Sequence, residues 1–236
     1  KADQSGADII TETTRLTAET VAANGYVQSK WVGEELVRAA GERGLPVAIH
    51  RPGLISGALN GGVMSQDDSF WNMIRAVAIL GIAPDLAGAT TELVPVDYVS
   101  KAIVAIALQP IGTQSRRQVF HHVNHRAVPV ADIFDVLATR GLPITTATLD
   151  EVGARLAREA RARNADGDDS LVRAAMLSGG YATARTVLQF DDANTRAALA
   201  GTGIECPAVD RSVLETYIDA FVESGFLPRP KESADT

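Results

Sequence analysis

Cysteine is nearly absent from this sequence, since Cys206 is the single one among 236 residues. One thiol can neither form an internal disulfide nor build a cysteine cage for zinc, so the composition favours a reducing compartment, and we expect the cytoplasm. Long apolar runs are also missing. The longest stretch without a charged or strongly polar residue covers 76–84, whereas a membrane-spanning helix needs about 20 apolar residues. The sequence therefore predicts neither a disulfide framework nor a membrane partner.

Basic side chains are outnumbered: 22 Lys and Arg stand against 29 Asp and Glu, a net charge of −7. Such a balance argues against nucleic acid or an anionic membrane as a partner, because both need a surface that neutralises phosphates. Hydrophobic residues make up 46% of the chain and charged residues 22%, which is typical of a globular protein with a sizeable core. The chain opens at Lys1, with neither an initiator Met nor a signal peptide, so we expect a piece of a longer polypeptide.

Apolar periodicity alternates between helical and strand patterns up to about residue 124 and is mainly helical afterwards. Gly and Pro punctuate the segments, and Asp97 is placed to cap the helix that follows it. The predicted helices are 26–42, 69–80, 98–108, a segment after Pro129, an Ala/Arg-rich region after Pro143, 195–200 and 211–224, and the predicted strands are 45–51, 93–96 and 118–123. This order indicates an α/β sheet portion with a helical appendage.

The most informative motif is a tyrosine and a lysine four residues apart, Tyr26 and Lys30, at the start of the first predicted helix. Residues with this spacing share one helix face, so the ammonium can lie near the phenol. A phenol transfers protons poorly at neutral pH until a nearby cation stabilises the phenolate. The motif therefore suggests a proton-transfer pair, against the alternative of an ordinary helix surface.

The context of this pair resembles the extended short-chain dehydrogenase/reductase superfamily. Its helix is followed by a buried strand that ends in Arg51-Pro52-Gly53, and open parallel sheets bind ligands just beyond such strand ends. The resemblance implies that Tyr26 donates a proton and that Lys30 binds the nicotinamide ribose and keeps the tyrosine acidic. It also implies that the backbone at Pro52, Gly53, Leu54 and Ile55 approaches the nicotinamide of a bound NADPH.

Several segments resemble one branch in particular, the thioester reductase domains of nonribosomal peptide synthetases, aminoadipate reductases and carboxylic acid reductases. The matching stretches are 24–34, 51–57, 94–99, 190–195 and 225–228. This resemblance implies that NADPH reduces an acyl or peptidyl thioester on a phosphopantetheinylated carrier protein to an aldehyde, with a second reduction to the alcohol left open. It further implies a monomeric domain within a larger multidomain enzyme.

A complete reductase of this kind begins with a glycine-rich turn that holds the pyrophosphate, and the sequence has none. Its tight glycine pairs, 61–62 and 179–180, do not join a strand to a helix at the required spacing. The catalytic Ser or Thr of the family would also fall before Lys1. We therefore expect the carboxyl-terminal part of a reductase. In this interpretation 1–57 and 91–124 form the carboxyl-terminal half of a Rossmann-like, doubly wound NADP-binding domain, and 58–90 with 125–236 form a mainly helical substrate-binding subdomain.

Two other functions stay open at this point. An extended reductase that acts on a free small molecule, such as a sugar-nucleotide epimerase or dehydrogenase, would share Tyr26 and Lys30. A docking module without catalysis would fit the missing glycine-rich half.

Two further clusters have plainer interpretations. A metal site at His121, His122 and His125 lacks a completing ligand and places neighbours on opposite strand faces. The arginines 155, 158, 161 and 163 could meet an acidic carrier, although a solvated helix face explains them equally well.

Overall fold

The computed structural model describes residues 9–19, 21, 25–86, 88–109, 118–165 and 189–229. The chain divides into two compact units, each of which is described by itself. The first unit takes in the described parts of 1–55, 97–125 and 186–207, and the second those of 56–96, 126–185 and 208–236.

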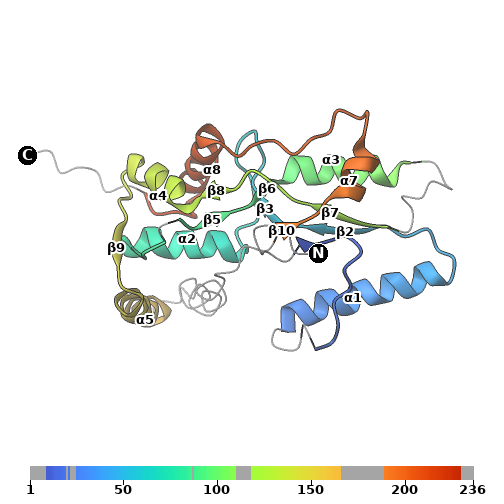
Figure 1. Cartoon of the computed structure of the whole chain (residues 1–236). Helices are drawn as coiled ribbons and strands as arrows, with labels where there is room; N and C mark the ends of the chain where they lie inside the picture. Colours follow the sequence, from blue (N-terminus) through green and yellow to red (C-terminus); the bar gives the residue numbers. More distant parts are fainter. Residues whose placement is uncertain are drawn as a thin grey trace, which may run out of the picture. The chain divides into compact units, whose positions relative to one another are not determined.

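The first unit is built around two parallel strands, β2 (Ile49–Pro52) and β7 (Val119–His122), paired from Ile49 opposite Val119 to Pro52 opposite His122. Helices α1 (Gly25–Glu42) and α3 (Val96–Ala107) cover opposite sides of this pair (Figure 1). Every residue of β7 is buried, as expected for a strand covered on both faces. This layering confirms the expected α/β, Rossmann-like architecture.

Two shorter elements complete the first unit. Strand β1 (Ile9–Ile10) pairs in parallel with β10 (Gln189–Phe190), and helix α7 (Ala193–Leu199) packs against β7. Because of these contacts, 189–207 belongs with the first unit. The sequence-based division placed it with the substrate-binding part, and 91–96, which was placed with the sheet, falls in the second unit.

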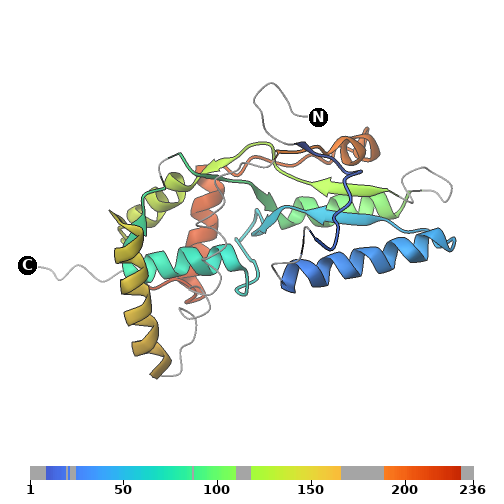
Figure 2. The same ribbon diagram turned by 60° about the horizontal axis from the view of Figure 1, so that its bottom comes forward.

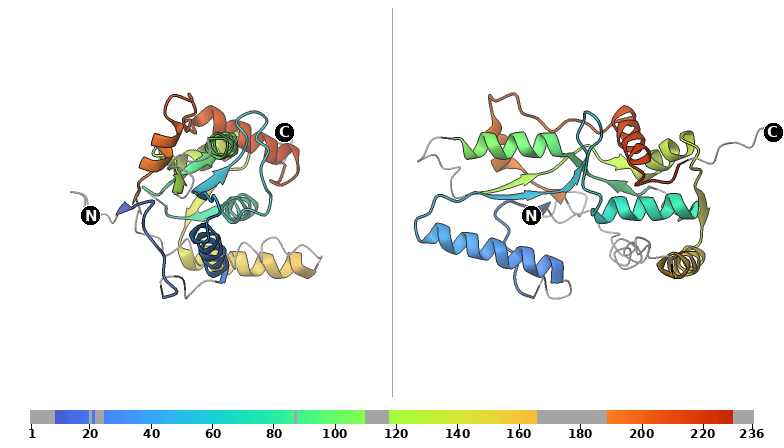
Figure 3. Two further views of the ribbon diagram at one scale, coloured as in Figure 1. Left: turned by 90° about the vertical axis from the view of Figure 1, so that its right-hand side faces the viewer. Right: turned by 180° about the vertical axis from the view of Figure 1, so that it is seen from behind.

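The second unit is mainly helical. Its helices are α2 (Ser69–Leu80), α4 (Val130–Thr139), α5 (Leu149–Ala165) and α8 (Arg211–Glu223), and its strands are β4 (Ile82–Pro84), β5 (Thr90–Thr91), β6 (Leu93–Pro95), β8 (Val128–Pro129) and β9 (Thr145–Ala147). Strand β4 pairs in parallel with β9, and β5 pairs antiparallel with β8. Helix α4 packs against α8, and α2 against α5 (Figure 3).

An aromatic cluster forms the core of the second unit. The indole of Trp71 on α2 is fully buried and contacts the rings of Phe70, Tyr217 and Phe221. The ring of Phe226 contacts that of Phe221 in turn. The amphipathic patterns of α2 and α8 thus meet in one core.

Several predicted element boundaries are accurate. Helix α1 begins one residue before the predicted start and ends at the predicted residue, and α2 matches its predicted span. Asp68 caps α2 by accepting hydrogen bonds from the amides of Phe70 and Trp71, and Gly81 ends it with a φ of 66°. Local capping chemistry accounts for this accuracy.

Other boundaries were wrong. Strand β2 begins at Ile49 and not at Leu45, and the Leu45 amide donates instead to the Ala40 carbonyl near the end of α1. Helix α3 begins at Val96, so Asp97 lies in its first turn and is not its N-cap. The shortest strands were not predicted, since a segment of two or three residues shows no periodicity. They are β1, β3 (Leu54–Ser56), β4, β5, β8, β9 and β10. The acidic run 166–169, whose composition predicts a surface loop, lies outside the described residues.

Among the helices that the structure describes, none is both long and apolar enough to cross a bilayer.

Candidate active site

Tyr26 and Lys30 lie together on the first turns of α1. The Lys30 Nζ is 5.3 Å from the centroid of the Tyr26 ring. The Tyr26 side chain is 71% exposed, so a reactant can reach the phenol. The two groups therefore face the same way, as the spacing predicted. An ammonium at this distance also stabilises the ring through its π face.

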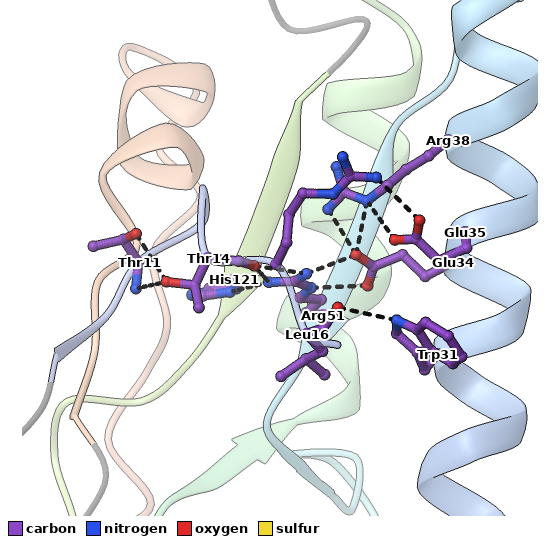
Figure 4. Close-up of polar contacts among 10 residues, drawn as sticks. Thr11, Thr14, Leu16, Trp31, Glu34, Glu35, Arg38, Arg51 and His121 are labelled. Atoms are coloured by element: carbon purple, nitrogen blue, oxygen red, sulfur yellow. Dashed lines mark hydrogen bonds and ion pairs between the residues drawn. The ribbon is translucent and has the colours of Figure 1, made fainter. Parts of the chain in front are cut away.

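The side chain of Arg51 on β2 forms a bidentate ion pair with Glu34 on α1, here called the arginine fork. The Arg51 Nε and Nη2 donate to the two carboxylate oxygens of Glu34 at 2.9 and 2.6 Å, and both of its Nη atoms donate to the Thr14 carbonyl at 3.1 Å. Arg38 donates to the same carboxylate at 2.6 Å, and the Trp31 indole donates to the Leu16 carbonyl at 3.1 Å (Figure 4). The helix that carries Lys30 is thus held to the strand by charge-assisted bonds.

The electrostatics of this fork favour the charged form of Glu34. Partial burial acts to raise the pKa of its carboxyl, but hydrogen bonds from Arg51 and Arg38 outweigh burial and lower it below the ordinary value. Glu34 is therefore an anion at neutral pH, held between two guanidinium groups.

The loop beyond β2 lies at the same end of the first unit as the start of α1. Helix α1 runs antiparallel to the strand that follows it, so the helix begins where the strand finishes (Figure 2). The Gly53 amide donates to the His122 carbonyl at 2.8 Å and completes the pairing with β7. Strand β3 (Leu54–Ser56) follows directly, with Ile55 exposed. Pro52 is thus the last residue of a parallel strand, and Gly53, Leu54 and Ile55 lie beyond its carboxyl end, where such sheets bind ligands.

A buried carboxylate that sequence reasoning missed organises the neighbouring elements. Glu12 is buried and accepts hydrogen bonds from the backbone amides of His121, Asn194 and Thr195 at 2.8, 2.5 and 3.2 Å, and from the Thr195 hydroxyl at 2.9 Å. It thereby joins β7 to the N-terminus of α7, where an anion is favoured. An isolated Glu in a polar stretch gives no local signal of this role.

The histidines form a structural pair in the sheet. The His50 Nδ1 and His122 Nε2 lie 2.8 Å apart, and their rings stack. Burial, followed by the charges of His50 and His121, lowers the pKa of His122 to about 4. His125 instead pairs with Asp192 at 3.1 Å. Within the described ranges no group of three or more His, Cys, Asp or Glu side chains is placed to hold a metal ion.

The arginines of α5 divide into two kinds. Arg155, Arg158 and Arg161 are exposed, whereas the Arg163 Nε contacts the Glu159 carboxylate at 3.1 Å. Leu156 packs inward on the α2 side. The exposed arginines are therefore consistent with a solvated helix face.

Comparison with known proteins places this geometry in a family. A family model for NAD-binding domains, described as male sterility protein, matches residues 2–103. The isonitrile lipopeptide synthase of Streptomyces coeruleorubidus is 34% identical over 87% of this chain and 14% of its own length. The L-2-aminoadipate reductase large subunit of Candida glabrata is 30% identical over the whole chain and 18% of its own length.

A solved structure gives the decisive match. The crystal structure of the terminal R domain from the myxalamid PKS-NRPS biosynthetic pathway has a TM-score of 0.79 and 33% identity over 95% of this chain. The chain belongs to the thioester reductase branch of the extended short-chain dehydrogenase/reductase superfamily. It spans 56% of that R domain, and a much smaller share of the two curated relatives. The helix that carries Tyr26 and Lys30 therefore lies in a segment that matches only part of the length of these relatives.

Proposed function

We propose that this chain is part of an NADPH-dependent reductase that releases an acyl or peptidyl group from a carrier-bound thioester as an aldehyde. The observation that carries the proposal is the exposed pair on α1, with the Lys30 Nζ 5.3 Å from the Tyr26 ring. The family membership supports the reduction, and the likeness to a terminal R domain supports a carrier-bound substrate.

The residues present fit a nicotinamide nucleotide. The Lys30 ammonium offers three donors, which suit the vicinal hydroxyls of a ribose. The open strand end at Gly53 leaves backbone that a flat ring can approach, and Leu54 and Ile55 offer apolar side chains beside it. When bound, the reduced nicotinamide supplies the hydride. Tyr26, Lys30, Pro52, Gly53, Leu54 and Ile55 would hold it.

The proposed role of Tyr26 is to protonate the substrate oxygen. As the thioester carbonyl gains hydride, negative charge develops on its oxygen, and the phenol donates its proton there. The Lys30 ammonium stabilises the phenolate that remains. The resulting thiohemiacetal then expels the carrier thiol and leaves the aldehyde. Overall, one thioester, one hydride and one proton give one aldehyde and one thiol.

The test uses the full-length protein with a carrier-bound acyl thioester and NADPH. We expect Tyr26→Phe to lower turnover by about 10²- to 10⁴-fold, the usual contribution of a general acid, while the dissociation constant for NADPH changes little. Lys30→Met should weaken NADPH binding as well as turnover. Lys101→Met is the matched control, because Lys101 is an exposed lysine on α3, and it should leave both quantities unchanged.

The competing functions give different results in the same experiment. Turnover with a free sugar nucleotide and none with the carrier thioester would assign the chain to another kind of extended reductase. Full turnover in the Tyr26→Phe variant would exclude the proton-donor role, and an absence of NADPH binding by the full-length protein would favour a docking module.

A further inference from the structure

The buried phenol of Tyr217 in the second unit is hydrogen-bonded next to the end of β3, the strand that carries Leu54 and Ile55. Tyr217 on α8 is fully buried, and its hydroxyl donates to the Gly57 carbonyl at 2.8 Å. The same hydroxyl lies 3.2 Å from the Oγ of Ser56, which is also buried. Ser56 is the last residue of β3, so the phenol holds the strand at the point where it ends.

The packing around this phenol leaves little room for movement. A Cβ added to Gly57 would lie 3.0 Å from the Tyr217 ring and 2.9 Å from the Gly62 carbonyl. A Cβ on Gly62, which has a φ of +63°, would lie 2.6 Å from the Thr216 carbonyl. Both glycines therefore allow the loop to approach α8 more closely than any side chain would permit.

The ring itself is fixed from another side. The Trp71 indole meets Tyr217 edge to face, with ring centroids 6.1 Å apart and planes at 88°. Aromatic pairs prefer this arrangement. Because the ring is clamped between α2 and the loop, its hydroxyl has a defined direction toward β3.

We propose that Tyr217 is a positioning residue for β3, the strand that carries Leu54 and Ile55. It acts on these two residues through its contacts with Ser56 and Gly57. The inference rests on the proposed function, because it requires that Leu54 and Ile55 face the nicotinamide. Ile55 and Ser56 are consecutive residues of one three-residue strand. An anchor at Ser56 therefore limits the displacement of the peptide before it.

The test measures NADPH binding directly in the full-length protein. Tyr217→Phe keeps the ring and removes only the hydroxyl, so Gly57 loses this donor and the strand end can shift. One net hydrogen bond corresponds to about a two- to tenfold change in an equilibrium constant. We expect the dissociation constant for NADPH to rise by that factor, and the fluorescence of bound NADPH to change as its nicotinamide surroundings loosen. Ser56→Ala, which spares the Gly57 bond, should have a smaller effect.

Tyr98→Phe is the matched control, since it removes a phenol hydroxyl buried in the first unit on α3. It should leave NADPH affinity unchanged. A merely structural role for Tyr217 would reduce the fraction of folded protein without altering the dissociation constant of the folded molecules. An unchanged constant in Tyr217→Phe would therefore overturn the inference. Failure of the proposed function is distinguishable, because the unmodified protein would then not bind NADPH.

Discussion

The arginine fork between α1 and β2 makes a quantitative test of how this fold holds its candidate site. We consider the replacement of Arg51 by Met, which keeps most of the apolar stem and removes the guanidinium. The variant loses the two-pronged contact to Glu34 and the two bonds to the Thr14 carbonyl. Both charged side chains are more than four-fifths buried, at 19% and 17% exposure. The pair is therefore far better shielded from water than a surface ion pair.

The expected loss of unfolding free energy follows from these contacts. A hydrogen bond to a charged group contributes about 1.5 to 3 kcal/mol, and Glu34 keeps its bond to Arg38 at 2.6 Å, which limits the penalty of an unpaired carboxylate. We expect Arg51→Met to lower the unfolding free energy by about 2 to 3 kcal/mol. With a slope of about 2 kcal/mol per molar urea, the unfolding midpoint falls by about 1 to 1.5 M.

The assay is urea unfolding followed by circular dichroism, with Arg211→Met as the matched control. Arg211 pairs with Glu215 on the surface of α8 at 3.2 Å and is 54% exposed, so its replacement should cost less than about 0.5 kcal/mol. A double-mutant cycle of Arg51→Met with Glu34→Gln should show a coupling of at least about 1 kcal/mol. Equal losses in the Arg51 and Arg211 variants would refute the reasoning.

Two further predictions concern packing and pH. Gly41→Ala should lower the free energy of unfolding by about 1 to 3 kcal/mol in urea unfolding, because the added Cβ would lie 2.6 Å from the Val47 Cγ2. Gly33→Ala on the same helix is the control. Its Cβ meets nothing within 4 Å, so this variant should raise the free energy of unfolding by up to about 1 kcal/mol. The pKa of His122 is about 4 in the fold against 6.5 in the unfolded chain, so the unfolded state binds the extra proton. The contribution of His122 to the free energy of unfolding should therefore be complete above pH 6.5. It should fall as the pH drops toward 4, by at most about 1.4 kcal/mol per pH unit. An equally steep pH dependence in a His122→Phe variant would contradict this assignment.

Local chemistry made much of the candidate site predictable from neighbouring residues alone. The four-residue spacing of Tyr26 and Lys30 predicts that the two side chains share a helix face, and the 5.3 Å approach agrees. Helical spacing is a property of residues close in the chain, so the sequence expresses it directly. The same holds for α2, because the residues that begin and end it, the N-cap Asp68 and the C-cap Gly81, directly flank the helix in the sequence. Roles of the site residues in catalysis and cofactor binding stay predictions.

Long-range contacts decided the rest. No residue near Glu12 in the sequence predicts that its carboxylate accepts hydrogen bonds from the amides of Asn194 and Thr195, which are 182 and 183 positions away. The sequence likewise predicts Tyr217 only as a core residue of an amphipathic helix. The hydrogen bond from its hydroxyl to the Gly57 carbonyl is visible only in the structure. Periodicity reports which face of an element is apolar, but the partner of a buried polar atom depends on how distant segments pack. Helix faces and caps were therefore fixed by local sequence, whereas the anchors of the strand ends came only from the tertiary structure.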